Sequence, residues 1–302
     1  MIKKEDKDDR IKIPKEIAKN IKLIELSTKI LATDTISGGY TSLFRGYGME
    51  FEEVREYFPG DDFRRIDWNV TARNNIPYIK RFKEERQITL MLLIDSSGSL
   101  NYGSKNNTKN KMVAEFASLI SFVALSNQDK IGSLFFTSKI EKYIPPTKSK
   151  NAILRLIREI IMLSPDEKKT DLNIALDFTL ETMKKRGIIF ILSDFYCDID
   201  YKKLFIAKKK HTIVPVVFCD EFEKSPIDVG LLDMVDNETG EIRLVDTSSP
   251  EYKKKVLDRE KKREKFLKEL KKIDIEPMEI DTESRIERVI IENIKKRKRH
   301  HI

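Results

Sequence analysis

The hydropathy pattern contains two apolar runs, one from Ile88 to Ile94 and one from Gly187 to Leu192. A strand that is buried on both faces of a parallel sheet has a sequence of this kind. Apolar residues at helical spacing follow the first run from Lys111 to Ser126 and the second from Tyr201 to Lys209. Strands that alternate with helices predict an α/β fold with a doubly wound, mainly parallel sheet.

The same periodicities extend this prediction along the rest of the domain. Further strands are predicted at 130–136, 140–144, 212–218 and near 277–280, and further helices at 151–163, 172–185, 251–272 and 284–295. The strand at 140–144 is expected to end at Pro145 and Pro146. Two more strands at 231–235 and 241–245, joined through Asn237-Glu238-Thr239-Gly240, predict an inserted β-hairpin.

Composition divides the chain into four parts. Residues 1–36 begin with a charged segment, which is expected to be disordered, and continue with a helix that opens near Pro14. Residues 37–87 form a small helical and β unit rich in arginine, acidic and aromatic residues, which starts with turns from Ser37 to Tyr47. Residues 88–294 form the main α/β domain with the hairpin at 231–245, and residues 295–302 form a basic tail.

Charge and cysteine usage limit the function classes. The net charge of +8 comes from 58 Lys and Arg against 50 Asp and Glu, and most of the excess lies in the basic tail rather than on a broad face. The apolar runs are far shorter than a bilayer span, and the N-terminus lacks an apolar signal core, so we expect a cytoplasmic protein. Cys197 and Cys219 are far apart, which favours neither a disulfide framework nor a zinc site.

Oxygen-bearing side chains follow both central strands. Asp95 ends the first strand, and Ser97 and Ser99 follow it at alternate positions. Thr170 precedes a predicted helix, and Asp194 ends the second strand. Because ligands of open parallel sheets bind at the carboxyl ends of the strands, we expect these five side chains to converge.

Two carboxylates and three hydroxyls make a set of hard oxygen donors. Such a set suits Mg²⁺ or Mn²⁺, which would retain waters or accept a carboxylate from another molecule to complete an octahedron. Helix capping is the alternative for each residue taken alone, since hydroxyls and carboxylates also accept from the N–H groups of a helix start. The occurrence of all five together favours the metal site.

The pattern Asp95-x-Ser97-x-Ser99 with Thr170 and Asp194 resembles the metal-ion-dependent adhesion site of von Willebrand A domains. This resemblance implies that the five residues coordinate Mg²⁺ directly or through water. It also implies that the main domain is a von Willebrand A type, Rossmann-like domain that binds a partner protein.

The segment before the main domain narrows the resemblance. It is similar to the signature of a bacterial family of unknown function, whose genes usually lie beside one for a MoxR-type AAA+ ATPase. The similarity runs from about Ser37 to the C-terminus and implies an adaptor or assembly function together with such an ATPase. The matching motifs are Phe44-Arg45-Gly46-x-Gly48-Met49-Glu50-Phe51, Arg55-Glu56-Tyr57-x-Pro59-Gly60-Asp61-Asp62, Arg64-Arg65-Ile66-Asp67-Trp68, Ala72-Arg73 and Lys80-Arg81-Phe82-x-Glu84-Glu85-Arg86.

Three interpretations of this segment stay open. Asp61, Asp62 and Asp67 could form the carboxylate cluster of a hydrolase, although adjacent carboxylates need not flank one cleft. A structural ion-pair network with Arg64, Arg65 and Arg73, packed by Trp68, is the second interpretation. The third is a surface that docks a partner, since Arg and aromatic residues dominate protein interfaces. The residues of that surface would be Arg55, Asp61, Asp62, Arg64, Arg65, Asp67 and Trp68.

The leading functional hypothesis is a metal-dependent protein-binding module without catalytic residues. A Mg²⁺- or Mn²⁺-dependent hydrolase at the same site is an alternative, because a bound cation can activate water. Against it, His211 lies at a strand start and His300 and His301 lie in the tail, so no histidine is placed as a general base. Nonspecific nucleic-acid binding through the basic tail is a further alternative.

Overall fold

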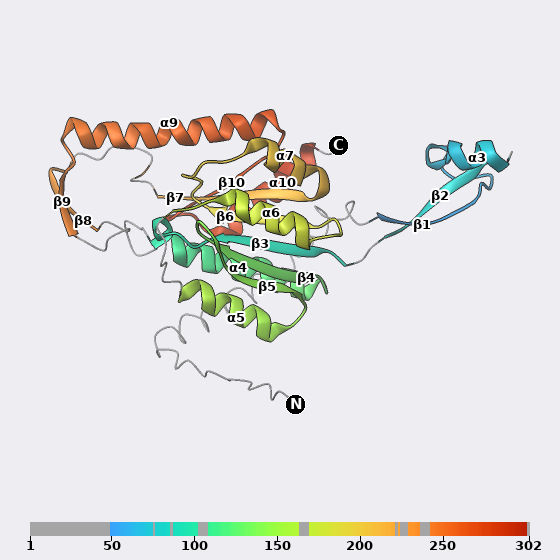
Figure 1. Ribbon diagram of the computed structural model, residues 1–302, viewed down its shortest axis with the longest axis horizontal. Helices are drawn as coiled ribbons and strands as arrows, with labels where there is room; N and C mark the ends of the chain where they lie inside the picture. The colour runs from blue at the N-terminus through green and yellow to red at the C-terminus, as the bar shows by residue number, and fades with distance from the viewer. Residues whose placement is uncertain are drawn as a thin grey trace.

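The computed structural model describes residues 49–74, 76–84, 87–101, 108–162, 169–220, 223, 229–235 and 242–300. The predicted disordered start, the helix near Pro14 and the turns from Ser37 to Tyr47 lie outside these ranges. The described residues form a central six-stranded sheet with helices on both faces, together with two separate two-stranded sheets (Figure 1).

The central sheet has the strand order β10-β7-β6-β3-β4-β5. Every neighbouring pair is parallel except β4 and β5. The chain adds β4 on one side of β3 and β6 on the other, so the strand order reverses at β3. This arrangement confirms the predicted doubly wound, mainly parallel α/β fold. The strands are β3 (Thr89–Asp95), β4 (Lys130–Phe136), β5 (Ile140–Thr147), β6 (Ile188–Ser193), β7 (Thr212–Cys219) and β10 (Met278–Asp281).

Helices cover both faces of the sheet (Figure 1). Successive residues of β3 alternate between the two resulting cores, with Leu92 in one and Leu93 in the other. Burial on both faces explains why the sequence of β3 is apolar throughout. One face carries α4 (Lys109–Ser126), α5 (Lys150–Ile161) and α10 (Ile286–His300), and the other carries α6 (Leu172–Thr182), α7 (Tyr201–Lys210) and α9 (Pro250–Lys272).

Three element boundaries differ from the prediction by three or more residues. β5 continues through Pro145 and Pro146 to Thr147, because it is an edge strand, where a residue without an N–H group is tolerated. α6 ends at Thr182, three residues before the predicted end. α10 continues to His300, so residues 295–300 of the predicted basic tail are helical.

Two small sheets flank the main domain. β1 (Met49–Glu56) and β2 (Tyr78–Glu84) pair antiparallel, and the 3-10 helix η1 (Phe63–Arg65) and α3 (Trp68–Asn74) lie between them in sequence. This upstream unit, residues 49–84, lies away from the central sheet (Figure 1). β8 (Leu231–Val235) and β9 (Ile242–Asp246) form the predicted hairpin, whose connection lies outside the described residues. Among the described helices, none is both long and apolar enough to cross a bilayer.

Candidate metal centre

Asp95 lies at the carboxyl end of β3, the strand at which the sheet order reverses. The N–H group of Ser96 donates to the carbonyl oxygen of Phe136 at the end of β4 (2.8 Å), and the 3-10 helix η2 (Gly98–Asn101) follows. These contacts turn the chain at the edge of the sheet and bury Asp95, which is only 1% exposed. Asp95 therefore lies where open parallel sheets bind their ligands.

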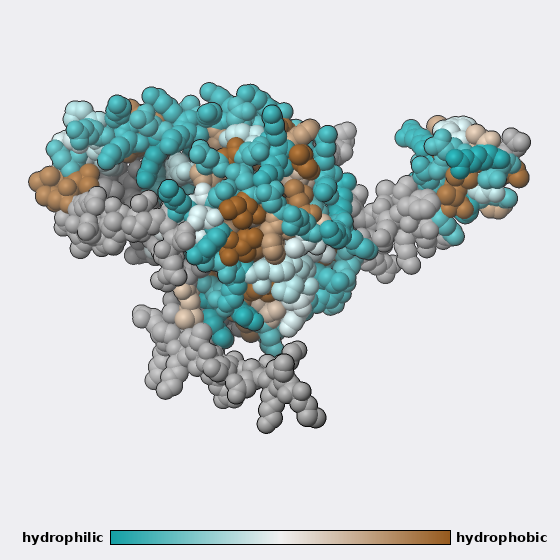
Figure 2. Space-filling model, in the orientation of Figure 1, coloured by the Kyte–Doolittle hydropathy of each residue, from teal (hydrophilic) through white to brown (hydrophobic). Residues whose placement is uncertain are grey.

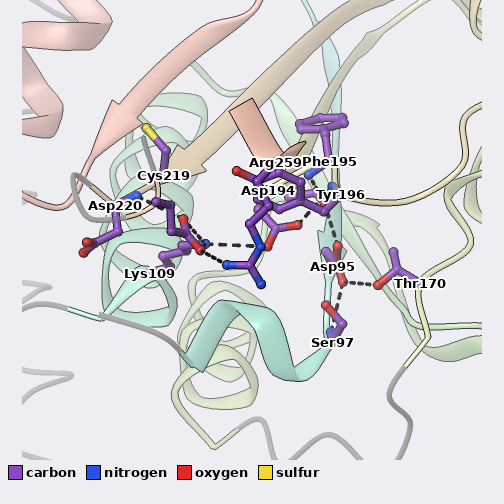
Figure 3. A network of polar contacts seen from close by, with 12 residues as sticks. Asp95, Ser97, Lys109, Thr170, Asp194, Phe195, Tyr196, Cys219, Asp220 and Arg259 are labelled. Atoms are coloured by element: carbon purple, nitrogen blue, oxygen red, sulfur yellow. Dashed lines mark hydrogen bonds and ion pairs between the residues drawn. The ribbon is translucent and has the colours of Figure 1, made fainter. Parts of the chain in front are cut away.

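Hydrogen bonds from three segments orient the Asp95 carboxylate (Figure 3). Its Oδ1 accepts from the N–H group of Ser97 at 2.9 Å and from the hydroxyl group of Thr170 at 3.3 Å. Its Oδ2 accepts from the hydroxyl group of Ser193 at 2.6 Å. The structure thus brings Ser97 and Thr170 to Asp95 and adds Ser193, the last residue of β6, which the sequence did not indicate.

Thr170 reaches Asp95 because its segment is anchored on the β4–β5 turn. The N–H group of Asp171 donates to the carbonyl oxygen of Thr137 at 2.9 Å. The Asp171 side chain caps α6 by accepting from the N–H group of Asn173 at 2.9 Å. Capping therefore falls to Asp171, and the Thr170 hydroxyl faces the Asp95 carboxylate instead.

Asp194 follows β6 and lies close enough to Asp95 for their charges to interact. Its Oδ1 accepts from the N–H group of Tyr196 at 3.3 Å. Its Oδ2 is buried and accepts no hydrogen bond from the described residues, although the Lys109 ammonium group lies 3.6 Å away. A buried carboxylate oxygen without a hydrogen-bond donor calls for another positively charged group, and a bound cation would meet that need.

Burial and the neighbouring Asp194 charge together raise the pKa of Asp95 to about 6. Burial is the larger cause, because removal of water destabilises the charged carboxylate. The hydrogen bonds from Ser193 and Ser97 act in the opposite direction. The site therefore holds two mutually repelling carboxylates in a dry environment, and a divalent cation would relieve that repulsion.

The donors fit a hard divalent cation. Asp95, Ser97, Thr170 and Asp194 supply carboxylate and hydroxyl oxygens at one edge of the sheet. Ser99 lies in η2, and its side chain is outside the described part of the chain. Within the described ranges, no group of three His, Cys, Asp or Glu side chains could hold a metal ion. A cation bound by Asp95 and Asp194 would therefore need hydroxyl, water or external oxygens to complete its coordination. Mg²⁺ and Mn²⁺ accept such mixed oxygen coordination.

A buried ion pair beside Asp194 was not indicated by the sequence. Lys109, the first residue of α4, has a fully buried side chain whose Nζ lies 2.8 Å and 2.7 Å from the two carboxylate oxygens of Glu223. One sequence signal could have revealed it. Lys109 shares the helical spacing of the buried residues Met112 and Val113, and a lysine on a buried helix face needs an acidic partner.

The carboxylates of the upstream unit have separate partners. Asp61 accepts two hydrogen bonds from the Arg55 guanidinium group, at 2.8 Å and 2.9 Å. Asp62 caps η1 by accepting from the N–H group of Arg64. Asp67 accepts from two N–H groups at the start of α3 and lies 3.4 Å from the Lys80 ammonium group. Such separated pairs are typical of a folded scaffold and give no carboxylate cluster among these three acids.

Aromatic side chains of the upstream unit face solvent. Trp68 is 69% exposed, Phe63 67% and Phe58 60%, so Trp68 does not pack over the ion pairs. The guanidinium groups of Arg64 and Arg55 lie over the rings of Phe63 and Phe58, at 5.9 Å and 5.6 Å from the ring centroids. Arg65 is exposed as well. Arginine and aromatic side chains of this kind are enriched in protein interfaces.

A family model described as "Protein of unknown function DUF58" matches residues 53–265. This range includes most of the upstream unit, all of the central sheet except β10, and most of α9. Among the relatives is the uncharacterised protein Rv1480 of Mycobacterium tuberculosis, which is 27% identical over 231 residues, or 76% of this chain and 73% of that protein.

Solved structures with a similar fold include the conserved hypothetical protein BatB from Bacteroides thetaiotaomicron. Its TM-score is 0.45, with 11% sequence identity over 70% of this chain and 99% of that chain. The SpRpn10 VWA domain has a TM-score of 0.37, with 11% identity over 68% of this chain and 94% of that chain.

Proposed function

This chain belongs to the DUF58 family, and on that premise we propose that it is a metal-dependent protein-binding module. The proposed site consists of Asp95, Ser97, Ser99, Thr170 and Asp194. One observation supports it above all others: two buried carboxylates, Asp95 and Asp194, lie together at the carboxyl edge of the sheet, and the Thr170 hydroxyl donates to Asp95.

The proposed cofactor is Mg²⁺ or Mn²⁺. The two carboxylates would supply negative charge and the hydroxyls would complete part of the coordination, as hard divalent cations prefer. Water molecules would fill the remaining coordination positions and could be displaced by a further oxygen ligand. An Asp or Glu side chain of a partner protein would then complete the octahedron and bind more tightly than water.

A hydrolase at the same site is less well supported. Among the described residues, a histidine that could act as general base is absent from this edge of the sheet. His211 lies between α7 and β7, at the opposite end of the parallel strands from Asp95, and is 1% exposed. A cation at this site would therefore be better suited to bind the carboxylate of a partner protein than to activate water for hydrolysis.

We propose a MoxR-type AAA+ ATPase as the partner, with the chain acting as a cytoplasmic adaptor or assembly factor beside it. The upstream unit would supply a second contact surface, made of Arg55, Arg64, Arg65 and Trp68 with the acids Asp61, Asp62 and Asp67. Hydrophobic side chains are visible on this unit in Figure 2, and isolated exposed aromatic residues of this size are common anchors of interfaces.

Affinity capture from the native cytoplasm tests the proposal. The tagged full chain is used with Mg²⁺ and with EDTA, beside Asp95→Ala and the control Asp177→Ala, which removes an exposed carboxylate paired with Lys203. We expect a partner that is retained in Mg²⁺ by the wild type and the control, and lost in EDTA or with Asp95→Ala. Equal recovery by all three proteins in both buffers would overturn the metal-dependent interaction.

A further inference from the structure

We propose that the buried Lys109–Glu223 pair sets the charge beside the metal centre. That charge would determine two affinities in opposite directions: that of the site for the cation and that of the bound cation for the partner's carboxylate. This inference rests on the proposed function, since it concerns the same site. It assigns Lys109 and Glu223 as positioning residues, which act through the charge they place beside Asp194 and not as metal ligands.

The pair joins three parts of the fold at the edge of the site, where Figure 3 shows Lys109 beside Asp194. Lys109 begins α4, Asp194 follows β6, and Glu223 follows β7. The Lys109 ammonium group lies 2.7 Å from Glu223 and 3.6 Å from Asp194 Oδ2, and all three side chains are no more than 7% exposed. Lys109 therefore neutralises two carboxylates at once, one of which belongs to the proposed metal site.

Glu223 is held in a fixed position. One carboxylate oxygen accepts from the N–H group of Asp220 at 3.2 Å, and the Asp220 carboxylate accepts from the hydroxyl group of Thr282 at 2.9 Å. On its outer side, Arg259 of α9 lies 3.8 Å from Glu223, and its guanidinium group lies over the Tyr196 ring. These contacts hold the Glu223 carboxylate beside the Lys109 ammonium group.

The position of these charges has a predictable effect on binding. Removal of the Glu223 charge takes one negative charge away from Lys109, which makes the surroundings of the cation more positive. Removal of the Lys109 charge has the opposite effect. In a poorly hydrated site, one unit charge several ångströms away changes cation affinity by about tenfold or more. A more positive site should bind the cation less tightly and the partner's carboxylate more tightly.

The test measures Mn²⁺ affinity by electron paramagnetic resonance on the full chain. Glu223→Gln is expected to raise the Kd for Mn²⁺ about tenfold, and Lys109→Gln to lower it about tenfold. The double variant, which removes both charges, should lie near the wild type. Arg259→Gln changes a side chain that is 58% exposed, so it should fold normally and lower the Kd by about twofold.

A second readout uses acetate as the carboxylate probe. Acetate displaces water from protein-bound Mn²⁺, and the change in water proton relaxation reports its affinity. We expect tighter acetate binding in Glu223→Gln and weaker binding in Lys109→Gln, opposite to the changes in Mn²⁺ affinity. A pair with only a structural role would change thermal stability and leave both affinities as they were.

The outcomes distinguish this inference from the proposed function. Absence of Mn²⁺ binding by the wild type would overturn both. Mn²⁺ binding that is lost in Asp95→Asn but is unchanged, or changed in the same direction, by Glu223→Gln and Lys109→Gln would retain the metal centre and overturn the role of the pair. If both of these variants fail to fold, a Kd for Arg259→Gln equal to or above that of the wild type overturns it.

Discussion

The hydroxyl oxygen of Thr170 lies 3.3 Å from Oδ1 of Asp95, although the two residues are 75 positions apart in sequence. Two contacts make this possible: the N–H group of Asp171 binds the β4–β5 turn at Thr137, and Asp171 caps α6 in place of Thr170. Because Asp171 caps α6, the Thr170 hydroxyl is not used as a helix cap. It donates instead to the Asp95 carboxylate, which already accepts hydrogen bonds from other donors.

Thr170→Val tests whether this hydroxyl serves the metal. Valine keeps the shape of the side chain and removes only the oxygen, so the fold should be retained while Mn²⁺ affinity falls at least about tenfold. Isothermal titration calorimetry measures the change. Thr212→Val is a matched control, because the buried Thr212 hydroxyl makes no hydrogen bond within the described residues. A loss of affinity as large in the control would argue against a specific role for Thr170.

Asp95→Asn should stabilise the metal-free protein while abolishing its response to metal. Burial and Asp194 raise the pKa of Asp95 to about 6, above the value of about 3.9 in an unfolded chain. The folded state therefore binds a proton more readily, and stability falls as the pH rises from 4 to 6 and stays reduced above that range.

Removal of the Asp95 charge should consequently raise the free energy of unfolding of the metal-free protein at pH 7.5 by about 1–3 kcal/mol. Urea denaturation without Mn²⁺ measures the free energy of unfolding, and the same experiment with Mn²⁺ measures how much the metal stabilises the protein. Asp177→Asn, at an exposed carboxylate, serves as the control and should alter neither. A destabilised metal-free Asp95→Asn protein would mean that the carboxylate is needed for its hydrogen bonds rather than poised for a cation.

Ser193→Ala should weaken metal binding without removing a proposed ligand. The Ser193 hydroxyl donates to Asp95 Oδ2 at 2.6 Å and accepts from the N–H group of Phe195 at 3.0 Å. Phe195 has a positive φ of 58°, a conformation that is uncommon outside glycine and that this hydrogen bond helps to maintain. Groups that orient metal ligands typically contribute 10- to 100-fold to affinity. We expect a loss within about this range by calorimetry; an unchanged Kd would show that Asp95 needs no such support.

Trp68→Ala tests the upstream unit. Because Trp68 is 69% exposed, its removal should leave the free energy of unfolding unchanged within about 0.5 kcal/mol, while recovery of the partner in affinity capture falls several-fold. Phe205→Ala on α7, also an exposed aromatic, is the control. If Trp68→Ala unfolds the upstream unit while the main domain still recovers the partner in full, Trp68 has a structural role instead.

The fold could be predicted from sequence because β3 and β6 are buried on both faces, and this burial leaves an uninterrupted apolar run in each strand. The proposed ligands follow from the same pattern, since Asp95 and Asp194 are the first acids after these runs. Parallel strands bring their carboxyl ends together whatever lies between them in sequence.

Other features depend on contacts that no local pattern encodes. Pro145 and Pro146 suggested a strand end, but β5 is an edge strand and tolerates both residues. The helical spacing of Lys109 with Met112 and Val113 indicates that it is buried, but its partner Glu223 lies 114 positions away, and no local pattern pairs the two. Ser193 follows the strand predicted at 187–192, and nothing in the sequence indicates that its hydroxyl group donates to Asp95.

His211 predicts a loss of stability in mild acid. Both ring nitrogens are buried without a hydrogen-bond partner in the described part of the chain. Burial, with smaller contributions from the Lys210 and Arg186 charges, lowers the pKa of His211 to about 4. The unfolded chain, with a histidine pKa of about 6.5, takes up a proton first.

The contribution of His211 to stability should therefore be complete above pH 6.5 and decline as the pH falls toward 4, by as much as about 3 kcal/mol, opposite in direction to the contribution of Asp95. Urea denaturation of metal-free wild type and His211→Phe between pH 4 and 8 measures this loss. The variant should retain its stability better than the wild type over that window, whatever its stability at pH 8. Parallel pH profiles for the two proteins would show that His211 is solvated or paired in the folded state, and the acid sensitivity would then have to arise from other groups.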